Sequence, residues 1–169
     1  MMERSKITPE QFVKDNYKYA LQVERETGIP ALAIMAQAAL ESAWGNKAIG
    51  NNIFGIKYKS GDALYQDVLT TEYSSKEDAY KDYESKTWIP GLKLWKFKKW
   101  SRFADYDSPL DAFRAHSRLL MSKRYIHALK WKYSPLRYLI AVWRAGYATD
   151  PNYGKKMSAM IYSVKKRLN

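Results

Sequence analysis

The chain has 169 residues with a hydrophobic content of 46% and an aromatic content of 15%, which allows a buried core and argues against a disordered protein. It contains no cysteine, which excludes disulfides and thiolate metal sites, and its two histidines are too few for a histidine-based zinc site. The net charge of +12 is uneven, since residues 1–75 carry 8 Lys and Arg against 9 Asp and Glu, whereas residues 76–169 carry 21 against 8.

The first part of the chain predicts two helices. The segment TPEQ at residues 8–11 combines an N-cap, a proline suited to the first helical position and a capping-box glutamine. It predicts a helix over residues 9–27 that stops at Gly28. The apolar segment after Pro30 predicts a second helix, which ends near residues 44–45.

The middle of the chain has the pattern of strands. Residues 64–73 alternate loosely and are rich in Val, Thr and Tyr, and residues 100–106 suit a second strand. The connecting segment 74–99 is aromatic and basic, and its Pro90-Gly91 pair predicts a turn.

The last third is helical again. Three pairs of a capping residue and a proline, at Ser108, Ser134 and Asp150, predict helices over 109–121, 135–145 and 151–167, with a shorter helix near 125–131. The expected fold class is therefore α+β and mainly helical. We expect a single lysozyme-like domain over residues 1–169, with a small β-lobe of two or three strands at about 53–107 inserted after the second helix.

Glu41 is the first candidate for chemistry. It closes the apolar run at residues 32–40 and is followed closely by Trp44. Such surroundings remove hydration, which disfavours the charged carboxylate and raises its pKa, as a proton donor near neutral pH requires. The alternative is a structural carboxylate that caps the helix or pairs with Lys47.

The ordered motifs of the chain carry a family resemblance. Residues 36–45, AQAALESAWG, and residues 52–57, NIFGIK, closely resemble the glucosaminidases of flagellar-rod and autolysin type, glycoside hydrolase family 73. Residues 70–73, TTEY, the stretch 103–108 that leads into a helix, and residues 146–153, GYATDPNY, match in the same order. The resemblance covers nearly the whole chain.

The resemblance implies an endo-β-N-acetylglucosaminidase that cuts peptidoglycan after N-acetylglucosamine without metal or cofactor. Glu41 would be the general acid, and Glu72 in the β-lobe would be the second carboxylate, which activates water or stabilises the transition state. Thr70 and Thr71 before Glu72 suggest a solvated, ionised group. The alternative for Glu72 is an ordinary surface carboxylate. We favour inversion of configuration over retention or assistance by the substrate acetamido group.

The resemblance also implies a tyrosine that faces the cleft, either Tyr125 or Tyr147, whose phenol would bind the acetamido group or position the water. Core packing is the alternative for each. Tyr153 is expected to lock the last helix into the body. His116 and His127 are expected to be structural or surface groups.

Four further residues are candidates for substrate binding. Gln37 lies one turn before Glu41 and would orient it or contact sugar, or else be a buried, satisfied amide. Phe54 and Tyr58 would form part of a sugar-stacking floor. Asp150 belongs to the GYATDPNY motif.

The segment 74–99 departs from the family pattern, where a shorter turn joins the two strands. It would be a wall-binding flap, a membrane-interface patch, or a segment whose aromatics pack the lobe. The basic region 86–169 is the candidate contact with an anionic wall polymer or a membrane surface, and its end at residues 165–167, KKR, would assist. Replacement of these three residues by Gln tests that role.

Other functions compete with this reading. A muramidase-type lytic enzyme or a non-catalytic wall-binding module would share the fold, whereas the basic charge alone would suit a nucleic-acid-binding protein. The sequence has no helix-turn-helix, zinc-ligand or aromatic RNA-binding motif, so we expect no nucleic acid. We expect a monomer whose partner is the peptidoglycan glycan strand.

The expected place of action is the bacterial cell wall. Residues 1–6 are polar, and the longest apolar stretch, about residues 27–40, is shorter than the ~20 residues of a membrane-spanning helix. We expect no signal peptide in this chain, with cytoplasmic synthesis followed by phage-type release, as for an endolysin, or by another export route.

Overall fold

The computed structural model describes residues 6–62, 64–148 and 150–169, and its chain contacts divide into two units. One unit is helical and contains the chain up to Ile56 and again from Tyr106 onwards, and the other is the β unit, Lys57–Asp105. Thr149 of the GYATDPNY motif lies outside the described residues. The β unit corresponds to the lobe expected at about 53–107.

The predicted helix starts are confirmed at three of the four positions where a capping residue precedes proline. Helix α1, Pro9–Thr27, begins where the Thr8 hydroxyl accepts a hydrogen bond from the Gln11 N–H at 3.1 Å, and it ends at Gly28 with φ of 78°. The other proline-led helices are α3, Pro109–Leu120, and α4, Pro135–Arg144. Proline fits this position because the first N–H groups of a helix have no partner within the helix, so its missing N–H removes no helical hydrogen bond.

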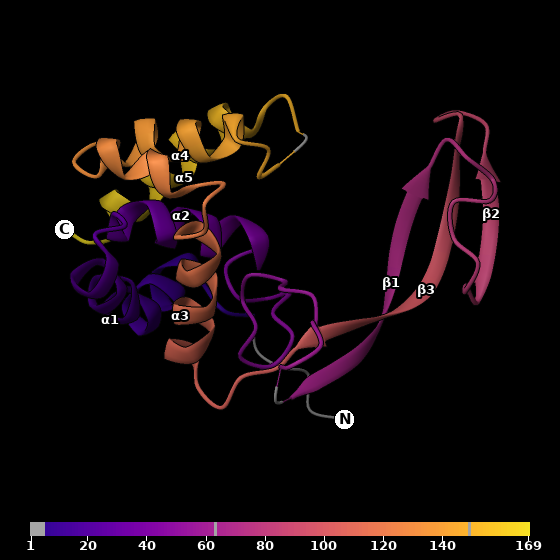
Figure 1. Cartoon of the computed structure of the whole chain (residues 1–169), viewed down its shortest axis with the longest axis horizontal. Coiled ribbons are helices and arrows are strands. Elements are labelled where there is room, and N and C mark those ends of the chain that lie inside the picture. Colours follow the sequence, from indigo (N-terminus) through magenta and orange to yellow (C-terminus); the bar gives the residue numbers. More distant parts are fainter. Residues whose placement is uncertain (1–5, 63, 149) are drawn as a thin grey trace. The chain divides into compact units, whose positions relative to one another are not determined.

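Helix α2, Ala31–Glu41, is the centre of the helical unit. Eight of its eleven residues are buried, and it contacts α1, α4 and α5 (Figure 1). The helix ends at Glu41 rather than near residues 44–45, so that expectation was wrong. Ala43 and Trp44 adopt φ values of 47° and 58°, which turn the chain out of the helix.

The last helices complete the unit. A 3-10 helix, η1, spans Ile126–Trp131, and α5 spans Tyr153–Lys166. Helix α5 begins two residues later than expected because Asp150 Oδ1 accepts a hydrogen bond from the Asn152 N–H at 2.8 Å and forms a turn before the helix. The fully buried core side chains come from every helix of the unit and include Phe12, Ile34, Phe113, Leu120, Leu139 and Met157.

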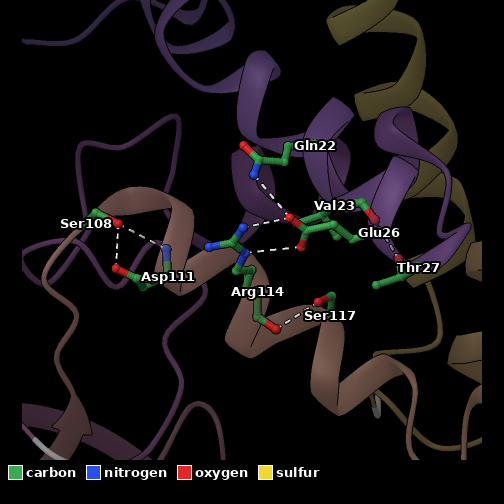
Figure 2. Close-up of polar contacts among 8 residues, drawn as sticks. All are labelled: Gln22, Val23, Glu26, Thr27, Ser108, Asp111, Arg114 and Ser117. Atoms are coloured by element: carbon green, nitrogen blue, oxygen red, sulfur yellow. Dashed lines mark hydrogen bonds and ion pairs between the residues drawn. The ribbon is translucent and has the colours of Figure 1, made fainter.

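Helices α1 and α3 are joined by a two-pronged ion pair. Arg114 of α3 donates from Nη2 to Glu26 Oε1 at 2.7 Å and from Nε to Oε2 at 3.1 Å (Figure 2). Gln22 donates to the same Oε1 at 3.1 Å. Because the pair is partly exposed, it contributes little to the free energy of unfolding. Its two-pronged geometry instead sets the orientation of α1 relative to α3.

The β unit is a three-stranded antiparallel sheet in the order β1-β3-β2. Strand β1 spans Tyr65–Ser74, β2 spans Ser85–Ile89, and β3 spans Leu94–Ala104, which lies between the other two (Figure 1). The strand expected at 64–73 is confirmed as β1. The segment 74–99 was expected to be only a connection, and this was wrong, since it contains β2 and the first half of β3.

The pairing register of the sheet decides which residues of β1 and β3 lie side by side. Strand β3 pairs with β1 from Tyr65↔Ala104 to Ser74↔Trp95, so Glu72 lies opposite Phe97. The rings of Tyr80 and Tyr83 pack edge-on against Phe97, at centroid distances of 5.1 and 5.6 Å. Aromatic residues of the segment 74–99 thus pack the lobe, as one of the three readings expected.

The turn predicted at Pro90-Gly91 is confirmed between β2 and β3. The Lys93 N–H donates to the Pro90 carbonyl at 3.2 Å, and Lys93 has a φ of 53°. Within the described residues, no helix combines the length and the apolar character that crossing a membrane requires.

Candidate active site

Glu41 ends helix α2, where a buried apolar segment reaches the surface. Its side chain is exposed to solvent, yet the surrounding protein desolvates the carboxyl enough to raise its pKa above the ordinary value. Both observations fit a carboxyl in a concave setting, which water enters but where protein replaces part of the hydration shell. The direction of the pKa shift that the sequence predicted is confirmed.

The position of Glu41 at the carboxyl end of α2 acts in the same direction. Helix carbonyls present partial negative charge there, which disfavours a further negative charge. Within the ranges that the structure describes, Glu41 forms no ion pair, with Lys47 or with any other cation. The expected alternative of a Glu41–Lys47 pair is therefore wrong.

Three tyrosines and a histidine cluster next to Glu41. The ring of Tyr147 lies 6.0 Å from that of Tyr125, 5.9 Å from that of Tyr153 and 6.0 Å from that of His116. Burial is the main cause that raises the pKa of Tyr147 well above its ordinary value, and the nearby Tyr153 and Glu41 add to it. Burial also raises the pKa of Tyr153, and Glu41 again contributes. Both phenols are thus kept neutral beside the carboxyl of Glu41.

Gln37 connects this cluster to the core. Its Nε2 donates to the Tyr153 hydroxyl at 2.9 Å, and its Oε1 lies 2.9 Å from His116 Nε2. Because the amide nitrogen is used by Tyr153, the oxygen accepts, and His116 Nε2 is the donor. Burial lowers the pKa of His116 to about 3, so the imidazole is neutral and structural. Tyr153 also ties α5 to α2, as expected.

Three predicted site residues are more buried than a substrate contact allows. Gln37 is fully buried with both polar atoms bonded, which favours the satisfied-amide alternative over contact with sugar. Phe54 is 5% exposed, and its ring stacks on His116 at 4.0 Å, which favours core packing over a floor for sugar. Tyr125 is also 5% exposed, whereas Tyr147 is half-buried, which favours Tyr147 as the tyrosine that reaches solvent.

Glu72 and Tyr58 belong to the β unit and line one open hollow of about 540 Å³. Lys57 Nζ lies 3.9 Å from Glu72 Oε1, and Lys57 and Lys99 line the same hollow. Desolvation lowers the pKa of Lys57, although Glu72 counteracts it. The two lysines were not predicted. The position of Lys57 at the end of the NIFGIK motif is the signal that pointed to it.

Asp150 is occupied by local contacts at the start of α5. It accepts from the Asn152 N–H and forms an ion pair with Lys156, which lowers its pKa. These contacts favour a structural role over the expected contact with substrate. Across the described residues, His, Asp and Glu side chains form no group of three or more that suits a metal ion.

Comparison with known proteins identifies the family. A family model described as glucosaminidase, mannosyl-glycoprotein endo-beta-N-acetylglucosaminidase, matches residues 17–166. The chain belongs to the glucosaminidase family. The match includes most of α1 and all later elements, and it confirms the resemblance to glycoside hydrolase family 73 on which the sequence reading depended.

Individual relatives of this glucosaminidase domain agree. The peptidoglycan hydrolase FlgJ of Salmonella typhimurium is 31% identical over 148 residues, which cover 83% of this chain and 41% of that protein. The autolysin of Enterococcus faecalis is 30% identical over 166 residues, which cover 91% of this chain and 20% of that protein. The chain thus spans less than half of the length of these relatives.

A solved structure supports the fold. A C-terminally truncated glycoside hydrolase domain from Salmonella typhimurium FlgJ superposes with a TM-score of 0.73 at 28% identity, covering 94% of this chain and 99% of that one. The expected lysozyme-like α+β fold, mainly helical with a small sheet, is confirmed.

Proposed function

We propose that this chain is an endo-β-N-acetylglucosaminidase of peptidoglycan, which hydrolyses the β-1,4 bond after N-acetylglucosamine. Membership of the glucosaminidase family supports a glycoside hydrolase. The observation that carries the proposal is Glu41, a carboxyl that solvent reaches and whose pKa is raised by desolvation. Under this proposal the protein acts on the bacterial cell wall, as a monomer and without metal or cofactor.

Glu41 is the general acid of the proposed reaction. A raised pKa increases the protonated fraction of the carboxyl at a given pH, which favours donation of a proton to the glycosidic oxygen as the bond breaks. Tyr147 is the proposed partner at this position. Since its pKa is also raised, its phenol stays neutral and can donate a hydrogen bond to the substrate acetamido group or orient the attacking water.

Glu72 is the second carboxylate of the proposal. Its hollow in the β unit is open to solvent and also contains Lys57 and Lys99. As the base of the reaction, Glu72 would take a proton from the attacking water, which gives inversion at the anomeric carbon. Tyr58, in the same hollow, is the proposed aromatic contact for a sugar ring.

The test is loss of turbidity of purified peptidoglycan by wild type, Glu41→Gln and Glu72→Gln, with released fragments identified by mass spectrometry. We expect each change to lower the rate by at least about 100-fold. Glu77→Gln is the matched control, because Glu77 is an exposed carboxylate of the β unit that pairs with Lys86 outside the Glu72 hollow. Its rate should equal that of wild type.

The fragments decide the class of enzyme. Reducing N-acetylglucosamine ends, absent for Glu41→Gln, are the expected result, and an initial α-anomer by NMR would establish inversion. Reducing muramic acid ends would replace the proposal with a muramidase. Failure of wild type to release any fragment would leave a wall-binding module.

A further inference from the structure

The carboxy-terminal region carries positive charge with almost no compensation. Residues 112–169 contain 13 Lys and Arg and a single acidic residue, Asp150, which already pairs with Lys156. Such a charge excess attracts anions but does not by itself define a site. A site requires several of these cations to converge on a surface of suitable shape.

Such a surface lies between η1 and α4. A groove of about 700 Å³ is formed there entirely by residues of the helical unit. We call it the η1–α4 groove. Helix α4 contributes Arg137, Ile140, Ala141 and Arg144, at positions i, i+3, i+4 and i+7. These positions share one helix face, so two arginines about 10 Å apart flank a low apolar centre.

The opposite wall adds a third cation and an aromatic ring. Lys130 and Trp131 of η1 line the groove, and Trp131 is 37% exposed. The Arg137 guanidinium lies 5.1 Å from the centre of the Trp131 ring, and Lys130 Nζ lies 5.7 Å from it. Contact with the ring restricts both flexible side chains, which lowers the conformational entropy lost when they bind an anion.

No carboxylate in the part of the chain that the structure describes neutralises the three cations. Among the described residues, Lys130, Arg137 and Arg144 form no ion pair, and no carboxylate lines the groove. Other arginines of the chain are used differently, since Arg114 pairs with Glu26 and Arg167 pairs with Glu10 at 3.0 Å. The groove cations are therefore available for an external anion.

We propose that the η1–α4 groove binds a phosphodiester-linked anionic polymer of the cell wall. Only the choice of a wall polymer rests on the proposed function. Guanidinium groups present paired donors that match phosphate, and two of them here stand at either end of the apolar centre. A chain of phosphates joined by uncharged carbon spacers matches this pattern, with phosphates at Arg137 and Arg144 and a spacer over Ile140 and Ala141.

The groove favours this polymer over a nucleic acid. Apart from His127, its lining has no neutral polar side chain to bond base edges, and Arg137 and Lys130 both contact the Trp131 ring, where they compete with a stacked base. The groove is also distinct from the Glu41 cluster, because it is lined by none of that cluster's tyrosines. It is a holding site and takes no part in the chemistry.

The test is binding of poly(glycerol phosphate) by the intact chain, measured by calorimetry at several salt concentrations. The variant is Arg137→Gln/Arg144→Gln, and the matched control is Lys14→Gln/Lys18→Gln, which removes the same charge from exposed positions of α1, outside the basic region 86–169. We expect the groove variant to weaken binding at least tenfold at low salt. Loss of two phosphate contacts should also make the salt dependence shallower by about 1.4 in log–log slope.

The control should retain affinity and slope close to wild type. Equal losses in both variants, or no binding by wild type, would overturn the proposal. Tighter binding of a single-stranded oligonucleotide with the same number of phosphates, or of vesicles with anionic lipids, would overturn the choice of polymer. Lysis of phosphate-free peptidoglycan should be unchanged in both variants, so failure of the binding proposal is separable from failure of the proposed enzyme activity.

Discussion

The buried amide of Gln37 permits a stability prediction worked from its contacts. Replacement by Leu keeps a similar volume but removes both hydrogen bonds, at 2.9 Å to Tyr153 and 2.9 Å to His116. The His116 N–H then loses its acceptor and the Tyr153 hydroxyl loses its donor, both in positions at most 2% exposed.

Each buried polar group left unsatisfied costs about 1–3 kcal/mol, and burial of the Leu side chain returns about 1 kcal/mol. We therefore expect Gln37→Leu to lower the free energy of unfolding by about 1–5 kcal/mol. For a chain of this size the melting temperature should fall by roughly 2–20 °C.

Urea unfolding followed by circular dichroism measures the change. Gln22→Leu is the control, because the Gln22 amide bonds Glu26 at the surface (Figure 2), and we expect a change within about 0.5 kcal/mol. In the double variant Gln37→Leu/Tyr153→Phe, removal of the stranded hydroxyl should make the total smaller than the sum of the single changes by about 1 kcal/mol. A loss below 1 kcal/mol for Gln37→Leu, or strict additivity, would refute this account of the network.

Three further predictions follow from single groups. The pKa of His116 is about 3 in the folded chain and about 6.5 in the unfolded chain, so the unfolded state binds the proton first as pH falls. Between pH 7 and 5, the free energy of unfolding should therefore drop by about 2 kcal/mol more in wild type than in His116→Leu. A parallel pH dependence in the two proteins would contradict this. Tyr138→Phe should raise the free energy of unfolding by about 1 kcal/mol, since the Tyr138 hydroxyl is buried without a partner among the described residues; a clear loss in urea unfolding would show a partner. Arg114→Gln should leave the urea midpoint of unfolding close to that of wild type, because the pair with Glu26 is open to solvent, and a large fall of the midpoint would mean that the pair is effectively buried.

Helix starts were predictable from the sequence because capping is local. A hydroxyl and the proline after it decide the first turn within four residues, as Thr8 and Ser108 do. Strand β2 was missed because its five residues, SKTWI, acquire their pattern only by pairing with β3. The full length of β3 was not predicted, because the adjacent Lys98 and Lys99 break the alternation of polar and apolar residues along the strand, although their side chains point to opposite faces of the sheet.

The candidate site was predictable in part for a similar reason. The apolar run before Glu41 indicated desolvation, which the structure bears out. Burial of Gln37 and Phe54 depended on packing with α3 and α5, far along the chain, where His116 and Tyr153 are located. The η1–α4 groove required the folded helix face, since Arg137 and Arg144 are seven residues apart.

The insertion of the β unit has a consequence for folding. The β unit is an insertion of about 50 residues between the two parts of the helical unit. In each unit, a hydrogen bond joins the chain segment that enters the insertion to the segment that leaves it. Within the β unit the Tyr58 N–H donates to the Arg102 carbonyl at 3.1 Å, and within the helical unit Asn51 Nδ2 donates to the Tyr106 carbonyl at 2.7 Å.

In an unfolded chain, bringing residues 56 and 106 together closes a loop of this length, at an entropic cost of about 3.5 kcal/mol beyond the constant part. If the sheet forms first, it already holds residues 56 and 106 close together, so little loop entropy remains to be lost. Helix α3 can then pack against α1 as if it followed α2 directly in the chain. The rate at which the helical unit assembles should accordingly follow the stability of the antiparallel pairing between β1 and β3, even though neither strand belongs to its core.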